Sequence, residues 1–225
     1  MIKDVLDGLK LVSEGIQNVK TIAKAVKDGT NYLKAKHPDV RDELRALLEE
    51  LRKNMNVIKQ ASAVLTNFRF AVAKPSELAR FNDYFIKSKT EAQQLHNQID
   101  DLRTHCSKIR MHAEKITHSA ASPAFAVFSL LGLNSPQREA ELGEKLYEIA
   151  YGDFSIAYSA ERMLGYLEEA LKDIQNALGT GGAMDAKKIP DAARLLGQYG
   201  PAFEKLENEA AAASIEITES AQNLI

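Results

Sequence analysis

Few residues in this chain have the types and spacing that chemistry requires, and the first candidate is an acid on an apolar helix face. Asp153 lies between Ile149 and Ile156 on the widest apolar stripe of the sequence. A carboxylate that faces a core must be paired, hydrated or protonated. It could therefore be an acid of raised pKa, or a polar residue that fixes the alignment of packed helices. We expect the second role, and we group Asp153 with two polar residues that interrupt other stripes, Asn54 and Ser88, as a buried polar seam.

A group of histidines and a cysteine is the second candidate. His105 and Cys106 are adjacent, and His112 follows two helical turns later, about 10 Å from His105 along a helix. That separation is too large for both imidazoles to bind one ion, and Cys106 falls on an apolar stripe where a small core residue is expected. The glycine-rich stretch 179–182 lacks the Lys-Ser/Thr ending of a phosphate loop and follows a helix. The sequence therefore predicts no metal, no cofactor and no catalytic residue.

Four aromatic residues form a second stripe on the same predicted helix. They are spaced four, three and four residues apart: Tyr147, Tyr151, Phe154 and Tyr158. This spacing places them on one face, about 120° from the main apolar stripe. Because Tyr and Phe are favoured at the centres of interfaces, the stripe could be a patch for a protein partner. The interpretation that we favour is that the apolar segment 123–133 folds back and covers this face.

The elements that position these residues are helices, because apolar residues recur along the chain at alternating spacings of three and four. The clearest helix is 136–178, which begins at Pro136 after Ser135 and ends before Gly179. It would be about 65 Å long. From Leu142 onward its apolar stripe is broad enough to face more than one neighbour.

Four more long helices and one short one follow from the same pattern. The long ones are 2–28 with a continuation to Lys36 left open, 38–72, 76–118 and 189–224, and the short apolar one is 123–133. Gly200-Pro201 is expected to break or kink the last helix. The sequence therefore predicts an all-α fold, an elongated antiparallel bundle of about five long helices plus one short apolar helix. We expect one helical-bundle domain over residues 1–225.

Composition narrows the classes of function. The net charge is −2, from 29 basic and 31 acidic residues, so nucleic acid is not expected as a partner. The single cysteine cannot form an intrachain disulfide, which is typical of a reducing, cytoplasmic setting. The N-terminus does not resemble a signal peptide, and the longest apolar run, 123–133, is too short to span a bilayer. We expect a cytoplasmic protein.

These observations favour a non-enzymatic module for protein interaction or assembly, in which the partner is another protein or a second copy of the chain. The alternative is a membrane-active bundle in which helix 2–28 detaches and inserts. That arrangement is similar in outline to helical cell-death domains of the HeLo and mixed-lineage-kinase-like type, in helix count and in its amphipathic N-terminal helix alone. Acidic residues in helix 2–28 nearly cancel its lysines, whereas helices that bind membrane surfaces are usually basic, so membrane binding is the less favoured alternative.

Overall fold

The computed structural model describes residues 2–36, 38–72, 78–98, 101, 103–104, 107–112, 156–179 and 185–225. In this part of the chain every element is a helix. The helices are α1 (Ile2–Lys36), α2 (Pro38–Ala71), α3 (Leu78–His96), α7 (Ile156–Leu178), the short 3-10 helix η1 (Ala186–Lys188) and α8 (Ile189–Asn223). The predicted all-α bundle is confirmed.

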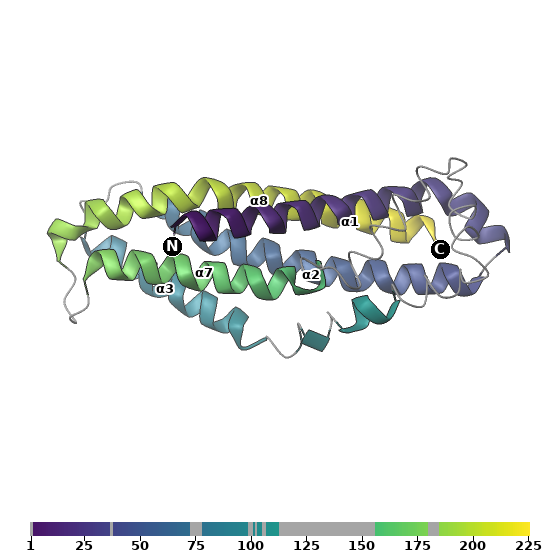
Figure 1. Cartoon of the computed structure of the whole chain (residues 1–225), viewed down its shortest axis with the longest axis horizontal. Helices are drawn as coiled ribbons and strands as arrows, with labels where there is room; N and C mark the ends of the chain where they lie inside the picture. The colour runs from purple at the N-terminus through teal and green to yellow at the C-terminus, as the bar shows by residue number, and fades with distance from the viewer. Residues whose placement is uncertain are drawn as a thin grey trace.

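The long helices lie lengthwise in an elongated bundle (Figure 1). α1 and α8 begin toward the left of the view and end toward the right, whereas α2 and α7 run the other way. Helices that follow one another among the described elements are therefore antiparallel. The first and the last, α1 and α8, run in the same direction, as contacts from Ser13 to Glu209 and from Lys27 to Glu219 confirm.

The core consists of the apolar stripes that the spacing predicts. α2 and α8 share the most extensive contact and form the central pair, and α1 packs mainly on α8. The stripe of α8 is almost completely buried, with exposed fractions of 3% or less at Ala192, Leu196, Tyr199, Phe203, Leu206, Ala210, Ala213 and Ile217. Such burial of one face is the main stabilising contribution to a helix in a bundle.

α3 is shorter than the sequence predicts. The prediction of an uninterrupted helix over 76–118 is wrong, because a turn at residues 97–98 separates α3 from a further helical stretch at 107–112. The amide of Gln98 donates to the carbonyl of Leu95, three residues back, which tightens the last turn. Asn97 stands at this turn, and asparagine is unfavourable inside a helix because its side chain competes for backbone hydrogen bonds.

The prediction that Gly200-Pro201 breaks the last helix is also wrong, because α8 continues through Pro201. Proline removes the N–H that would donate to the carbonyl of Gly197. Gly197 and Pro201 are both exposed, so water can donate to that carbonyl instead. Tyr199 and Phe203 on either side are fully buried and hold the helix to the core.

Two other predicted features fall outside the described residues, namely the short helix 123–133 and the part of helix 136–178 that precedes Ile156. At the other end of the chain, α1 continues to Lys36 without an interruption. Among the helices that the structure describes, none combines the length and the apolar character that crossing a bilayer requires.

Gly8 allows α7 to pack closely on α1, and this contact gives a first testable prediction. A Cβ atom at position 8 would overlap the ring of Tyr166. We expect Gly8→Ala to lower the free energy of unfolding by about 1–2 kcal/mol, because overpacking outweighs the gain in helix propensity. Gly165→Ala is the matched control, since no atom lies within 4 Å of a Cβ there, and it should be neutral or stabilising in thermal unfolding. A stabilised Gly8→Ala variant would contradict the close packing.

Candidate functional site

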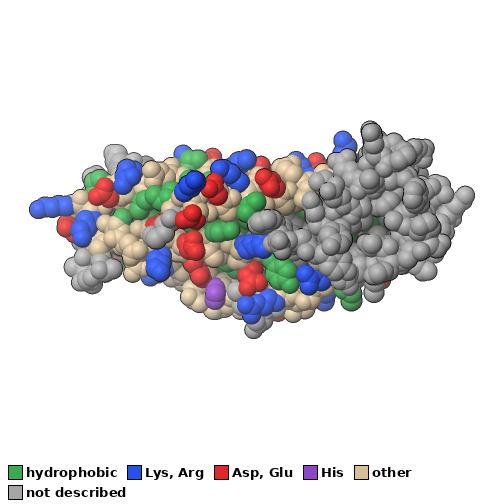
Figure 2. Space-filling model, viewed as in Figure 1, with side chains coloured by type: hydrophobic (Ala, Val, Ile, Leu, Met, Phe, Trp, Pro, Cys, Tyr) green, Lys and Arg blue, Asp and Glu red, His purple; other side chains and the backbone are tan. Residues whose placement is uncertain are grey.

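A groove of about 660 Å³ lies between the first turns of α1 and the middle of α8. Its floor is apolar, with Ile2, Leu6 and Leu9 from α1 and Ala202 and Leu206 from α8. Leu9 and Leu206 are buried, but Ile2, Leu6 and Ala202 are only partly covered. Figure 2 shows apolar surface interleaved with charged side chains over the end of the bundle where α1 and α8 begin. The bundle thus leaves part of an apolar surface open between two parallel helices.

The rim of this groove is charged. Lys3, Asp7 and Lys10 come from α1, and Lys205 comes from α8. Lys10 Nζ lies 2.8 Å from Asp7 Oδ1, and this hydrogen bond is the main reason that the pKa of Asp7 is lowered. Both side chains are well exposed, so the pair contributes little to stability. Lys205 Nζ in turn lies 3.6 Å from Glu209, so the three lysines of the rim exceed the two acids beside them by one positive charge.

Ser13 marks one end of the groove. Its hydroxyl donates to Glu209 Oε2 at 2.7 Å, and Lys205 Nζ lies 3.6 Å from the other carboxylate oxygen of Glu209. Ser13 is 8% exposed, and the side chain of Glu209 is 19% exposed. A hydrogen bond to a carboxylate is stronger than one between neutral groups, and this one joins α1 to α8. It sets the spacing of the two helices where the groove ends.

A buried pair between α7 and α8 was missed by the sequence interpretation. Tyr199 Oη donates to Asp173 Oδ2 at 2.5 Å, with Tyr199 fully buried and Asp173 8% exposed. Burial raises the pKa of Tyr199 far above its usual value near 10, and the hydrogen bond to Asp173 raises it further. A tyrosine on a core stripe needs a partner for its hydroxyl, which was the available signal. The pair is enclosed in the core, so its role is structural.

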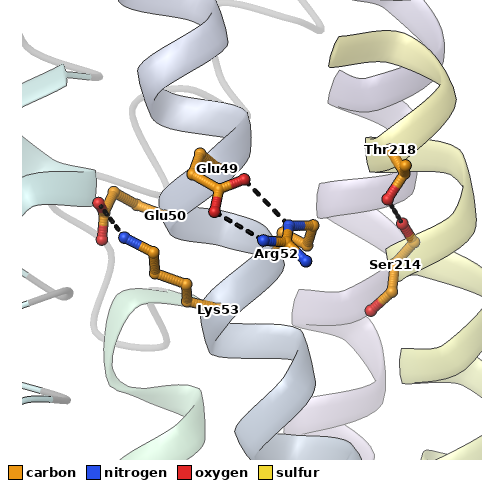
Figure 3. A network of polar contacts seen from close by, with 6 residues as sticks. All are labelled: Glu49, Glu50, Arg52, Lys53, Ser214 and Thr218. Carbon is orange, nitrogen blue, oxygen red and sulfur yellow. Dashed lines mark hydrogen bonds and ion pairs between the residues drawn. The ribbon is translucent and has the colours of Figure 1, made fainter. Parts of the chain in front are cut away.

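Further polar contacts lie on α2 and near the end of α8 (Figure 3). Glu49 and Arg52 lie on the side of α2 toward α8, and Glu50 and Lys53 lie on the side away from it. Arg52 makes two hydrogen bonds to Glu49, at 2.7 and 3.0 Å, and Lys53 Nζ lies 3.0 Å from Glu50 Oε1. The hydrogen bond from Arg52 lowers the pKa of Glu49 and raises that of the guanidinium. On α8, the hydroxyl of Thr218 donates to a carbonyl of its own preceding turn. These contacts remain within their own helices and therefore indicate helix stabilisation.

The predicted aromatic patch is described at one of its four positions. Tyr158 is 38% exposed, and the guanidinium of Arg110 lies 5.9 Å from the centre of its ring, within the range of a cation–π contact. Tyr147, Tyr151 and Phe154 lie outside the described residues. The patch as a unit therefore stays a prediction.

The predicted polar seam is described at two of its three positions. Asn54 is 1% exposed and Ser88 is 3% exposed, so both lie in the core of the bundle. Asp153 lies outside the described residues, and its role in helix alignment stays a prediction. Two polar pairs that the structure brings together across helices, Asp173 with Tyr199 and Ser13 with Glu209, were not part of that seam.

Histidine, cysteine and acidic side chains are the usual protein ligands of metal ions. Within the described residues, no three side chains of His, Cys, Asp or Glu converge as a metal site would require. His112 Nδ1 lies 2.6 Å from Glu43 Oε2, which ties the stretch 107–112 to the first part of α2. His105 and Cys106 lie outside the described part of the chain.

Comparisons with protein-family models, with curated proteins and with solved structures found no match to this chain. Among the features above, the buried pairs are closed contacts between side chains. The groove between α1 and α8 is open, and it combines an apolar floor with a charged rim.

Proposed function

We propose that this chain is a non-enzymatic interaction module that binds a partner protein in the groove between α1 and α8. The observation that carries the proposal is the incomplete cover of the groove floor, where Ile2, Leu6 and Ala202 keep part of their apolar surface exposed. Concave apolar surfaces with a few polar groups at their edges are the usual form of binding sites. Two neighbouring helices also provide a natural seat for a third helix.

The buried titratable groups support an interaction module over an enzyme. A catalytic acid or base must reach a substrate within hydrogen-bond distance. Asp173 is bonded to Tyr199 inside the core, and Glu209 is bonded to Ser13 between two helices. Both carboxylates thus already hold structural partners.

The packing of α1 supports an interaction module over a membrane-active one. The apolar stripe that would have to enter a bilayer faces the core, with Val12, Ile16 and Val19 at 2% exposure or less. Burial of each such side chain stabilises the folded chain by about 1.5–3 kcal/mol relative to its exposure. Ser220 Oγ also donates to the carbonyl of Ala23 at 2.7 Å, so α1 is tied to α8 beyond the groove. Detaching α1 would expose all of this surface.

Site-specific crosslinking tests the proposal. A photoreactive amino acid at Leu6 should form a discrete adduct with one partner protein in the cells that produce the chain, and the purified partner should bind the purified chain directly. Ile86 on α3, which is 54% exposed and lies outside the groove, is the matched control position and should give no such adduct. Ala202→Glu, which places a charge on the groove floor, should abolish the Leu6 adduct. Equal labelling from both positions, or none from Leu6, would contradict the proposal.

A further inference from the structure

We infer that the groove between α1 and α8 takes an amphipathic helix whose polar flanks are acidic. This inference rests on the proposed function and specifies the chemistry of the partner. It depends on three properties of the groove, which are its length and shape, the state of the backbone in its walls, and the charge of its rim.

The length of the groove suits a short helix. It follows α1 from Ile2 to Ser13, which is about 16 Å or three helical turns. On its floor, Ile2, Leu6 and Leu9 recur at a spacing of four and three, and Ala202 and Leu206 recur at a spacing of four. A docked helix with apolar residues at the same spacing can place one on the floor at each turn.

The walls of the groove favour a helix over an extended peptide. Apart from the N–H groups in the first turn of α1 and the Gly197 carbonyl opposite Pro201, the backbone groups of α1 and α8 along the groove are bonded within each helix. An extended segment would find no edge with which to pair its own N–H and carbonyl groups, whereas a helix satisfies these groups internally. The groove is also open along one side, so a thin lipid chain would keep much of its surface in water.

The charge of the rim favours acidic flanks on the partner. Lys3 and Lys10 lie two turns apart along α1, and Lys205 lies on the opposite rim on α8. Asp7 is bonded to Lys10, and Glu209 lies 3.6 Å from Lys205, so the three lysines exceed these two acids by one positive charge. A two-fold dimer that joined the grooves of two copies would bring the lysines of both rims together, which disfavours such a dimer.

Two synthetic peptides test the inference against the full chain. Both have about 18 residues and the same leucine face at helical spacing, and they differ only in whether glutamate or lysine flanks that face. In fluorescence anisotropy titrations, the glutamate peptide should bind about tenfold more tightly than the lysine peptide. This preference should shrink in about 0.5 M NaCl, because exposed charges are then screened.

Charge reversal on the rim provides the decisive variant. Lys3→Glu/Lys10→Glu/Lys205→Glu should weaken the glutamate peptide and strengthen the lysine peptide, so that the preference inverts. The matched control Lys24→Glu/Lys59→Glu/Lys172→Glu reverses three exposed lysines that do not line the groove and changes the net charge equally. It should leave the order of the two affinities unchanged.

Several results would overturn the inference. Equal binding of both peptides, abolished by Ala202→Glu, would leave a groove that binds helices without regard to charge. That result contradicts the acidic partner and preserves the proposed function. Binding of neither peptide would also overturn the inference. So would displacement of the glutamate peptide by phosphatidylcholine–phosphatidylglycerol vesicles, or its displacement when the chain dimerises, as measured by sedimentation. Crosslinking from Leu6 then decides separately whether a protein partner uses the groove.

Discussion

Replacing Tyr199 by phenylalanine should lower the free energy of unfolding by about 2–3 kcal/mol, although the change removes a single oxygen atom. The hydroxyl is the donor to Asp173 Oδ2 at 2.5 Å, inside the contact between α7 and α8. Without it, a carboxylate that is 8% exposed keeps its desolvation cost and loses its hydrogen bond. Urea unfolding followed by circular dichroism measures the difference.

A double variant separates the hydrogen bond from the packing of the ring. Tyr199→Phe/Asp173→Leu replaces both partners by apolar groups and should recover most of the loss, because no buried polar group then lacks a partner. A Tyr199→Phe cost below about 0.5 kcal/mol would show that Asp173 finds another donor in the variant.

The pH dependence of stability provides a second check on the same pair. The pKa of Tyr199 is raised in the folded chain above its usual value near 10. Its contribution is therefore fully present below pH 10 and is lost as the pH rises further, since the unfolded tyrosine releases its proton first. The free energy of unfolding should fall above pH 10 by up to about 1.4 kcal/mol per pH unit more in the wild type than in Tyr199→Phe. Parallel pH profiles would contradict the raised pKa.

The apolar stripes of the helices were predictable because burial in a bundle is periodic. A residue on the stripe of α8, such as Leu196 or Phe203, faces the core because it recurs with the helical turn. The ends of α2 followed equally from local signals, with Pro38 in the first turn and a proline shortly after Ala71. Interactions within one helix join residues that are close in sequence, so they can be predicted without knowledge of the partner helix.

The groove was not predictable, because it depends on which residues of distant helices meet. Lys3 and Lys10 belong to the lysines whose charge is nearly cancelled within helix 2–28, and nothing local connects them to Lys205. Asp173 presents the same difficulty. It flanks the stripe of α7 beside Ile174, and its burial follows only from the position of Tyr199 on α8. Pairing across helices requires the register of the bundle, which the spacing of apolar residues leaves open.

Truncating Phe68 to alanine should lower the free energy of unfolding by about 4 kcal/mol, and it should loosen α3 more than any other helix. Phe68 is 1% exposed on α2, and its ring packs edge-on against Phe81 at 5.1 Å and in a tilted arrangement against Phe85 at 6.2 Å. These two residues are the largest buried side chains that α3 contributes to the core. Loss of Phe68 therefore removes the aromatic contacts that α2 makes with both of these residues of α3.

The polar contacts that join α3 to α7 add little to its attachment. Lys89 with Gln175 and His96 with Glu168 join α3 to α7, but these are exposed polar pairs, which contribute little. In Phe68→Ala, hydrogen exchange should therefore accelerate first in residues 78–96, as local opening of one helix. Phe203→Ala is the matched control, because Phe203 is fully buried on α8 and its loss should accelerate exchange in the central helices α2 and α8. Uniform acceleration in both variants would mean that α3 unfolds only with the whole bundle, since exchange would then report global opening in each case.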